Sequence, residues 1–210
     1  MRLVVTRPAG QERDLAARLE ALGHDVVHCP LIRIEPLSDD PIDVGEYDWV
    51  VVTSPNGARE LLRRARGTMP RVAAIGRATA DAVGHADLVA VVSTQEGLAA
   101  EMPRPPGRVL VAAAEGARTY LTDALAADFV PLYRTLPIRP EPLPSGDLCL
   151  LASASAARAF AELGTGIPVV SIGPETTRVA REAGIEVLAE ATTHDVDGLV
   201  RAVQRLAIGS

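Results

Sequence analysis

Short apolar runs alternate along the chain with stretches in which apolar residues recur at helical spacing. The clearest case is residues 48–57, where an aspartate opens a run of β-branched and aromatic residues that Thr53-Ser54 and Pro55-Asn56-Gly57 bring to an end. A continuous apolar run bounded by turn residues is typical of a buried parallel strand, and the apolar period that follows is typical of a helix. The segment therefore predicts a strand that enters a helix through a turn lined with hydroxyl groups.

The same alternation continues over the whole chain and predicts an α/β fold. We expect about ten strands with about eight helices between them; the strands are residues 2–6, 25–29, 48–53, 71–75, 87–92, 108–113, 129–133, 147–152, 168–172 and 185–189. A strand, a crossover helix and a second strand predict parallel pairing. In an open α/β sheet, ligands bind beyond the carboxyl ends of the strands, so the strand-to-helix turns are the expected place for a site.

An internal repeat with a period near 100 residues divides the chain. Residues 48–54 resemble 147–153, residues 75–79 resemble 172–176, and the proline-bounded segment 30–36 resembles 131–137. A repeat longer than about 50 residues indicates duplicated domains rather than stacked solenoid units.

The repeat allows two domain partitions. A cut at the prolines of residues 103–107 would give two consecutive halves. Alternatively, the two proline-bounded strands, near 31–37 and 132–137, are crossings between two bodies. Residues 38–134 then form one domain, and residues 1–34 with 138–210 form the other. We favour this discontinuous partition because each body then holds five strands.

Composition and charge exclude several classes of partner. The 210 residues are 48% hydrophobic and only 3% aromatic, so the core is built from Ala, Val and Leu. The net charge is −6 and no basic run occurs, which argues against nucleic acid or an anionic membrane as partner. No transmembrane run or signal peptide is recognisable, and the two cysteines are isolated, so we expect a cytoplasmic protein.

Familiar cofactor and nucleophile motifs are absent from the sequence. It contains no G-x-G-x-x-G, no P-loop and no G-x-S-x-G. His24 and His28 flank a strand without a second pair at ligand spacing, so no metal site is predicted.

Hydroxyl residues at the strand-to-helix turns are the remaining candidates: Thr53, Ser54, Thr79, Ser153, Ser155, Thr176 and Thr177. Each alone is typical of a helix cap. Together, at the carboxyl ends of strands in both halves, they would suit a polyanion bound by backbone N–H groups at helix starts. Tyr133 differs from its repeat partner Ile32; it is either a packed aromatic or a functional phenol.

These segments, in this order, resemble the uroporphyrinogen-III synthase family over essentially the whole chain. The likeness rests on Val5-Thr6-Arg7-Pro8, Pro30-Leu31-Ile32, the stretch 48–57, Ile75-Gly76 with Thr79-Ala80, Arg118 with Leu121, Tyr133-Arg134, Ser153 with Ser155, and Ile172-Gly173-Pro174 with Thr176. The chain departs from the family at Ala113-Ala114, where an Arg-Gly or similar pair is usual. It also departs at Glu175, which adds a negative charge beside a proposed anion site.

The resemblance implies two flavodoxin-like domains with parallel five-stranded sheets, joined by a two-stranded linker. It implies a monomeric, cofactor-independent lyase that cyclises hydroxymethylbilane, a linear polycarboxylate tetrapyrrole, with loss of water and inversion of ring D. Tyr133 would be the acid that helps hydroxide leave. The substrate-binding residues would be Ser54, Asn56, Thr79, Arg118, Ser153, Ser155 and Thr176. The alternative is a non-catalytic two-lobed tetrapyrrole-binding or regulatory module of the same fold. Tyr133 and the hydroxyl turns in both halves favour the enzyme.

Overall fold

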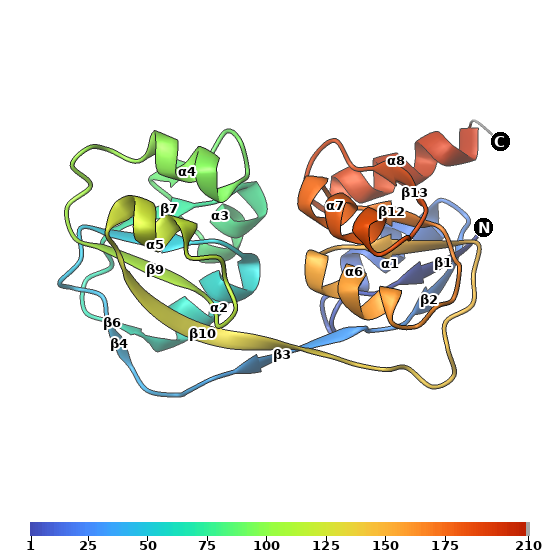
Figure 1. Ribbon diagram of the computed structural model, residues 1–210, viewed down its shortest axis with the longest axis horizontal. Helices are drawn as coiled ribbons and strands as arrows, with labels where there is room; N and C mark the ends of the chain where they lie inside the picture. Colours follow the sequence, from blue (N-terminus) through green and yellow to red (C-terminus); the bar gives the residue numbers. More distant parts are fainter. Residues whose placement is uncertain (209–210) are drawn as a thin grey trace. The chain divides into compact units, whose positions relative to one another are not determined.

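The computed structural model describes residues 1–208 and divides the chain into two compact units. Unit 1 contains Met1–Arg33 and the chain from Thr135 onward, and unit 2 is Ile34–Arg134. Each unit is a sheet with helices on both faces, so the chain is an α/β protein in which parallel pairing dominates (Figure 1).

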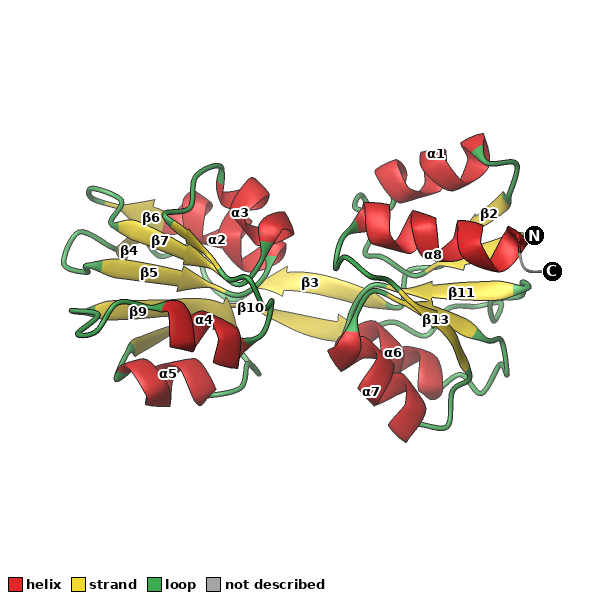
Figure 2. Ribbon diagram, turned by 90° about the horizontal axis from the view of Figure 1, so that it is seen from above, coloured by secondary structure: helices red, strands yellow, loops and turns green. Residues whose placement is uncertain are grey.

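Unit 1 has a five-stranded parallel sheet in the order β13-β12-β11-β1-β2. Helices α1 and α8 cover one face and α6 and α7 the other, as Figure 2 shows. Its elements are β1 (Arg2–Val5), α1 (Arg13–Ala21), β2 (Asp25–His28), β11 (Leu148–Leu151), α6 (Ala154–Ala161), β12 (Val169–Ser171), α7 (Pro174–Glu182), β13 (Val187–Glu190) and α8 (Val196–Ile208).

Unit 2 has the strand order β3-β10-β9-β5-β7-β8, with α2 and α3 on one face and α4 and α5 on the other. Its elements are β3 (Ile32–Pro36), β4 (Ile42–Asp43), β5 (Trp49–Val52), α2 (Pro55–Arg64), β6 (Ala65–Arg66), β7 (Arg71–Ala74), α3 (Arg77–Val83), β8 (Leu88–Val89), α4 (Gln95–Glu101), β9 (Val109–Ala114), α5 (Tyr120–Leu125) and β10 (Asp128–Pro137). A separate two-stranded ladder pairs β4 with β6.

The prediction of two five-stranded parallel sheets is wrong for unit 2, whose sheet has six strands and is mixed. The sixth strand is β3, which pairs with β10. The Leu37 N–H donates to the Leu132 carbonyl (3.1 Å) and the Ile138 N–H to the Leu31 carbonyl (2.7 Å). The partner's number falls as the residue number rises, which is antiparallel pairing. The boundaries between the units lie inside these two strands.

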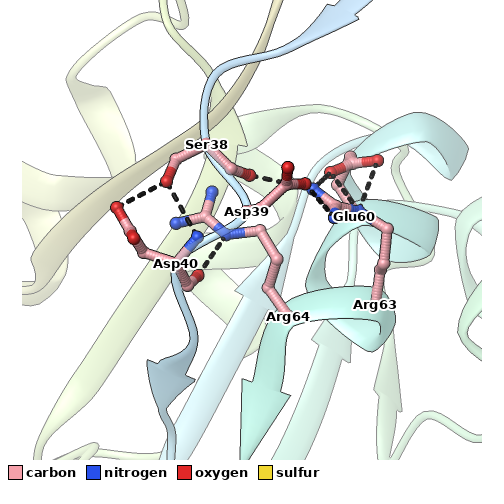
Figure 3. A network of polar contacts seen from close by, with 6 residues as sticks. All are labelled: Ser38, Asp39, Asp40, Glu60, Arg63 and Arg64. Atoms are coloured by element: carbon pink, nitrogen blue, oxygen red, sulfur yellow. Dashed lines mark hydrogen bonds and ion pairs between the residues drawn. The ribbon is translucent and has the colours of Figure 1, made fainter.

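A polar network fastens the segment after β3 to the last turn of α2 (Figure 3). Arg63 binds Asp39, Glu60 and the Ser38 carbonyl, and the buried Arg64 donates from Nε to the Asp40 carbonyl (2.8 Å). Cationic side chains at a helix C-terminus also interact favourably with the helix dipole. The segment that follows β3, residues 38–40, is therefore tied to α2 of unit 2.

Three aspartates at the amino-terminal edges of the sheets share one hydrogen-bond arrangement. In each case the aspartate backbone N–H donates to the carbonyl of a residue on the neighbouring strand, and its carboxylate accepts the N–H of that same residue. The pairs are Asp48 with Arg108, Asp87 with Val72, and Asp147 with Arg2, at 2.7–2.8 Å throughout. The acid that opens these apolar runs thus satisfies a strand-end amide, on the edge opposite the strand-to-helix turns.

We expect Asp147→Ala to lower the free energy of unfolding by about 1 kcal/mol, because it leaves the Arg2 amide without its acceptor. The matched control is Asp25→Ala, which removes only a long, exposed ion pair to Arg2 (3.7 Å). Urea denaturation of both variants measures the difference. Equal denaturation midpoints for the two variants would show that the bond from the Arg2 N–H to the Asp147 carboxylate adds no stability.

Two glycines allow loops to pack closely on the helices that follow them. A Cβ added at Gly97 of α4 would overlap the Val92 carbonyl oxygen, and one added at Gly198 of α8 would overlap that of Thr193. The N–H groups of the same glycines are capped by Thr94 Oγ1 (3.0 Å) and Asp195 Oδ1 (2.7 Å). The two loops are therefore repeat-related and share one geometry.

Candidate active site

Ser54 and Ser153 occupy equivalent positions at the carboxyl edges of the two sheets. Ser54 is the N-cap of α2 and accepts the Gly57 N–H at 3.0 Å; Ser153 is the N-cap of α6 and accepts the Ala156 N–H at 3.1 Å. Both serines have the extended backbone that an N-cap requires. The capping role therefore holds for both, and the other first-turn amides of each helix remain directed toward the edge.

Tyr133 lies beside Ser54 at the carboxyl edge of unit 2. Its register partner is Ala114 of β9, and its hydroxyl is 2.8 Å from Ser54 Oγ. Tyr133 is 6% exposed and packs in the core formed with α2 and α3. Gly57 leaves room for this arrangement, because a Cβ there would be 3.2 Å from Ser54 Oγ and 3.8 Å from the tyrosine ring.

The hydrogen-bond arrangement leaves the phenol able to donate a proton. Ser54 Oγ already accepts from Gly57, so its own hydrogen can be given to the Tyr133 oxygen. The phenolic hydrogen is then free for another acceptor. Burial raises the pKa of Tyr133, and the hydrogen bond from Ser54 opposes that shift only in part. The phenol therefore stays protonated at neutral pH.

Thr79 and Thr176 also take equivalent places, each the third residue of its helix, α3 or α7. Both are buried, at 3% and 4% exposure. Glycines, Gly76 and Gly173, stand at the N-cap positions and provide no side-chain cap. Side chains of other loops pack against both N-cap glycines, Ser93 on Gly76 and His194 on Gly173.

Of the other predicted contacts, Asn56 and Arg118 bind side chains of their own unit. Arg59 donates to Asn56 Oδ1 (3.0 Å), and Ser155 is half-buried in the first turn of α6. Arg118 is exposed and forms a forked pair with Glu96 (2.9 and 3.3 Å) that joins the start of α5 to α4. The Glu96 carboxylate therefore competes with any ligand carboxylate for this guanidinium.

Two further side chains, Thr177 and Glu175, lie in the first turn of α7 at the carboxyl edge of the sheet in unit 1. The Thr177 hydroxyl donates to Glu190 and is 2.5 Å from Ser171 Oγ, so it belongs to a buried internal chain. The Glu175 carboxylate pairs with Arg178 at 2.7 Å. That pairing offsets part of the negative charge that Glu175 brings to the start of α7.

The Ser54–Tyr133 pair is the feature that the sequence pattern did not reveal. The repeat distinguished Tyr133 from Ile32, but nothing in the pattern joined it to Ser54, which lies 79 residues away. Within residues 1–208 no three His, Cys, Asp or Glu side chains gather as metal ligands, and no helix has the length and apolarity to cross a membrane.

The fold defines an α/β protein of two repeat-related units. In each unit, capped helix starts lie at the carboxyl ends of parallel strands. A family model described as uroporphyrinogen-III synthase HemD matches residues 13–201. A uroporphyrinogen-III synthase of Synechococcus elongatus is 27% identical, over 98% of this chain and 95% of that protein. The chain belongs to the uroporphyrinogen-III synthase family.

Solved structures agree on the fold. A mutant uroporphyrinogen III synthase of Thermus thermophilus superposes with a TM-score of 0.67 at 17% identity, covering the full length of both chains. The uroporphyrinogen-III synthetase of Helicobacter pylori gives a TM-score of 0.64 at 17% identity, covering 98% of this chain and all of that one.

Proposed function

We propose that this protein is a cyclising lyase that converts hydroxymethylbilane into uroporphyrinogen III, with loss of water and inversion of ring D. The observation that carries the proposal is the buried Ser54–Tyr133 pair at the carboxyl edge of a chain that belongs to this family. A phenol at the carboxyl edge of an α/β sheet supports the proposal, because ligands of such sheets bind beyond that edge.

Tyr133 is assigned the donation of a proton to the leaving hydroxyl. The pyrrole electrons expel the hydroxyl once it is hydrogen-bonded or protonated, and one positioned acid assists that step. Holding the chain so that ring D attacks through its substituted carbon, giving a spiro intermediate, lowers the barrier by more than one positioned acid does.

Carboxylate groups of the substrate are assigned to the helix starts in both units. Backbone N–H groups at a helix start carry positive potential even in a protein of net negative charge. The assigned residues are Ser54, Asn56, Thr79, Arg118, Ser153, Ser155 and Thr176. To bind Arg118, the substrate carboxylate must displace Glu96 or share the Arg118 guanidinium with it.

The proposal includes a monomer that acts in the cytoplasm without metal, cofactor, nucleic acid or membrane. The assay supplies freshly made hydroxymethylbilane to protein that has been exhaustively chelated and dialysed, and separates the I and III isomers of the product. Excess III isomer over the protein-free control supports the assignment. Binding of the tetrapyrrole without formation of the III isomer would support the regulatory alternative, and restoration of activity by an added metal or nucleotide would overturn the cofactor-free reaction.

We further propose that the two units are flavodoxin-like domains and that β3 and β10 are the linker between them. The strand order of unit 1, numbered along the chain, is 2-1-3-4-5, which is the flavodoxin order. Without β3, unit 2 has the same spatial arrangement when its strands are matched to those of unit 1 through the repeat.

Residues 38–134 expressed alone should therefore fold. We expect a cooperative thermal transition for this fragment, because it retains a core on both faces of its sheet. The control fragment 1–103 lacks β9, which lies between β5 and β10, and should show no such transition. A folded 1–103 and an unfolded 38–134 would disprove the partition.

A further inference from the structure

The loop between β8 and α4, residues 90–94, presents two exposed valines. Val91 is 87% and Val92 is 59% exposed, more than any other large apolar side chain that the structure describes. A single exposed apolar residue needs no explanation. Two adjacent ones, at the carboxyl edge of the sheet in unit 2, require one.

The backbone of this loop is held in place from several sides. The Val91 N–H donates to Glu101 Oε1 at 2.9 Å, and the Thr94 N–H donates to the Val92 carbonyl at 2.7 Å. The same carbonyl packs on Gly97. The valines are thus carried by an ordered backbone, so little conformational entropy would be lost when a ligand covers them.

The turn itself does not require valine. The repeat-related loop of unit 1 places the Thr193 carbonyl on Gly198 as Val92 is placed on Gly97, and Asp195 caps Gly198 as Thr94 caps Gly97. The positions that match Val91 and Val92 hold Thr192 and Thr193, which are also exposed. Threonine has nearly the shape of valine, so the same geometry forms with a polar residue.

The valines border the candidate substrate edge. Ser93, which follows Val92 in the chain, lies against Gly76, where an added Cβ would be 2.8 Å from Ser93 Oγ. Gly76 is the N-cap of α3, the helix that carries Thr79. Ligand sites are lined mainly by apolar groups with a few polar ones, whereas the residues assigned to the substrate in this unit are hydroxyls, an amide, an arginine and a phenol.

We propose that Val91 and Val92 contact the pyrrole rings of the linear tetrapyrrole while the helix starts bind its carboxylates. The inference rests on the proposed function and adds the apolar part of the site in unit 2. The faces of the rings are apolar in substrate, intermediate and product alike, so this contact stabilises all of them. It should therefore lower KM and leave kcat nearly unchanged.

The test is the double substitution Val91→Thr/Val92→Thr, which copies the threonines of unit 1. We expect KM for hydroxymethylbilane to rise about three- to tenfold from the lost apolar contact, with kcat within about twofold. The affinity for uroporphyrinogen III should fall by a similar factor, and Val91→Thr alone should give an intermediate value. The control is Leu62→Gln, an exposed leucine in the last turn of α2 of the same unit, which should leave KM unchanged.

The outcomes separate the two proposals. If the unsubstituted protein forms no III isomer, the proposed function fails. If it is active but the double variant keeps its KM and its affinity for product, the function stands and the ring contact is disproved. A melting temperature lowered well below that of Leu62→Gln would mean that the valines pack within the protein. A loss of self-association in sedimentation would mean that they face a second copy. Each of these two results overturns the inference.

Discussion

Tyr133→Phe should lose roughly ten- to a thousand-fold in kcat, in line with the removal of one positioned acid. The phenol is buried and protonated, and its oxygen lies 2.8 Å from Ser54 Oγ, so the substitution removes the hydroxyl without removing the ring. Turnover should persist at the lower rate because the pyrrole still expels the hydroxyl and the edge still holds the substrate. KM should change little, since the carboxylates are bound elsewhere.

Two further measurements make this result specific to the phenol. Tyr47→Phe removes a phenol that bonds to Asp128 (3.0 Å) near the amino-terminal edge of the same sheet, and it should leave kcat unchanged. The product of Tyr133→Phe should remain the III isomer, because ring orientation depends on binding. Full activity in Tyr133→Phe would return this residue to the role of a packed aromatic.

The pH dependence follows from the direction of the pKa shift. Burial raises the pKa of Tyr133 above its ordinary value of about 10, so the donor is present throughout neutral pH. The part of kcat that depends on the phenol should decline only as the pH rises through that raised pKa. Tyr133→Phe should lack this alkaline limb.

Gly198→Ala should give a large loss of stability, about 1–3 kcal/mol, because a Cβ would overlap the Thr193 carbonyl at the start of α8. The loop would have to move, and the move would disturb the Asp195 cap on the same residue. In a chain of this length, such a loss lowers the melting temperature by about 2–4 °C for each kcal/mol.

Gly116→Ala is the matched control for this prediction. Gly116 has no heavy atom within 4 Å of an added Cβ and no positive φ, so alanine there meets neither overlap nor strain. Differential scanning calorimetry compares the two variants with the unsubstituted protein. Equal melting temperatures would mean that the loop before α8 yields without loss of packing.

The local sequence pattern predicted much of the fold, because buried parallel strands and amphipathic helices leave periodicities that need no partner to be read. All ten expected strands have counterparts in the structure, and Ser54 and Ser153 cap helices as their positions indicated. The two-residue strands β4 and β6 were missed because neither lies in an apolar run: β4 is within the polar stretch after β3, and β6 follows α2 directly.

The features that the sequence did not predict depend on contacts between residues far apart in the chain. The antiparallel contact of β3 with β10 and the bond from Ser54 to Tyr133 join residues far apart in the chain, so no local pattern encodes them. The same limit applies to Arg118. The family resemblance implied that Arg118 binds substrate, whereas its engagement with Glu96 depends on how α4 and α5 pack.

The insertion of unit 2 between β2 and β11 has a consequence for synthesis on the ribosome. β1 lies in its sheet between β2 and β11, so this first strand emerges with one of its two neighbours still about 140 residues from being made. Residues 34–134 emerge as an uninterrupted block and can complete their sheet while β1 still has an open edge. Until translation reaches Leu151, β11 is not available to cover that edge of β1, and the edge can pair with another molecule.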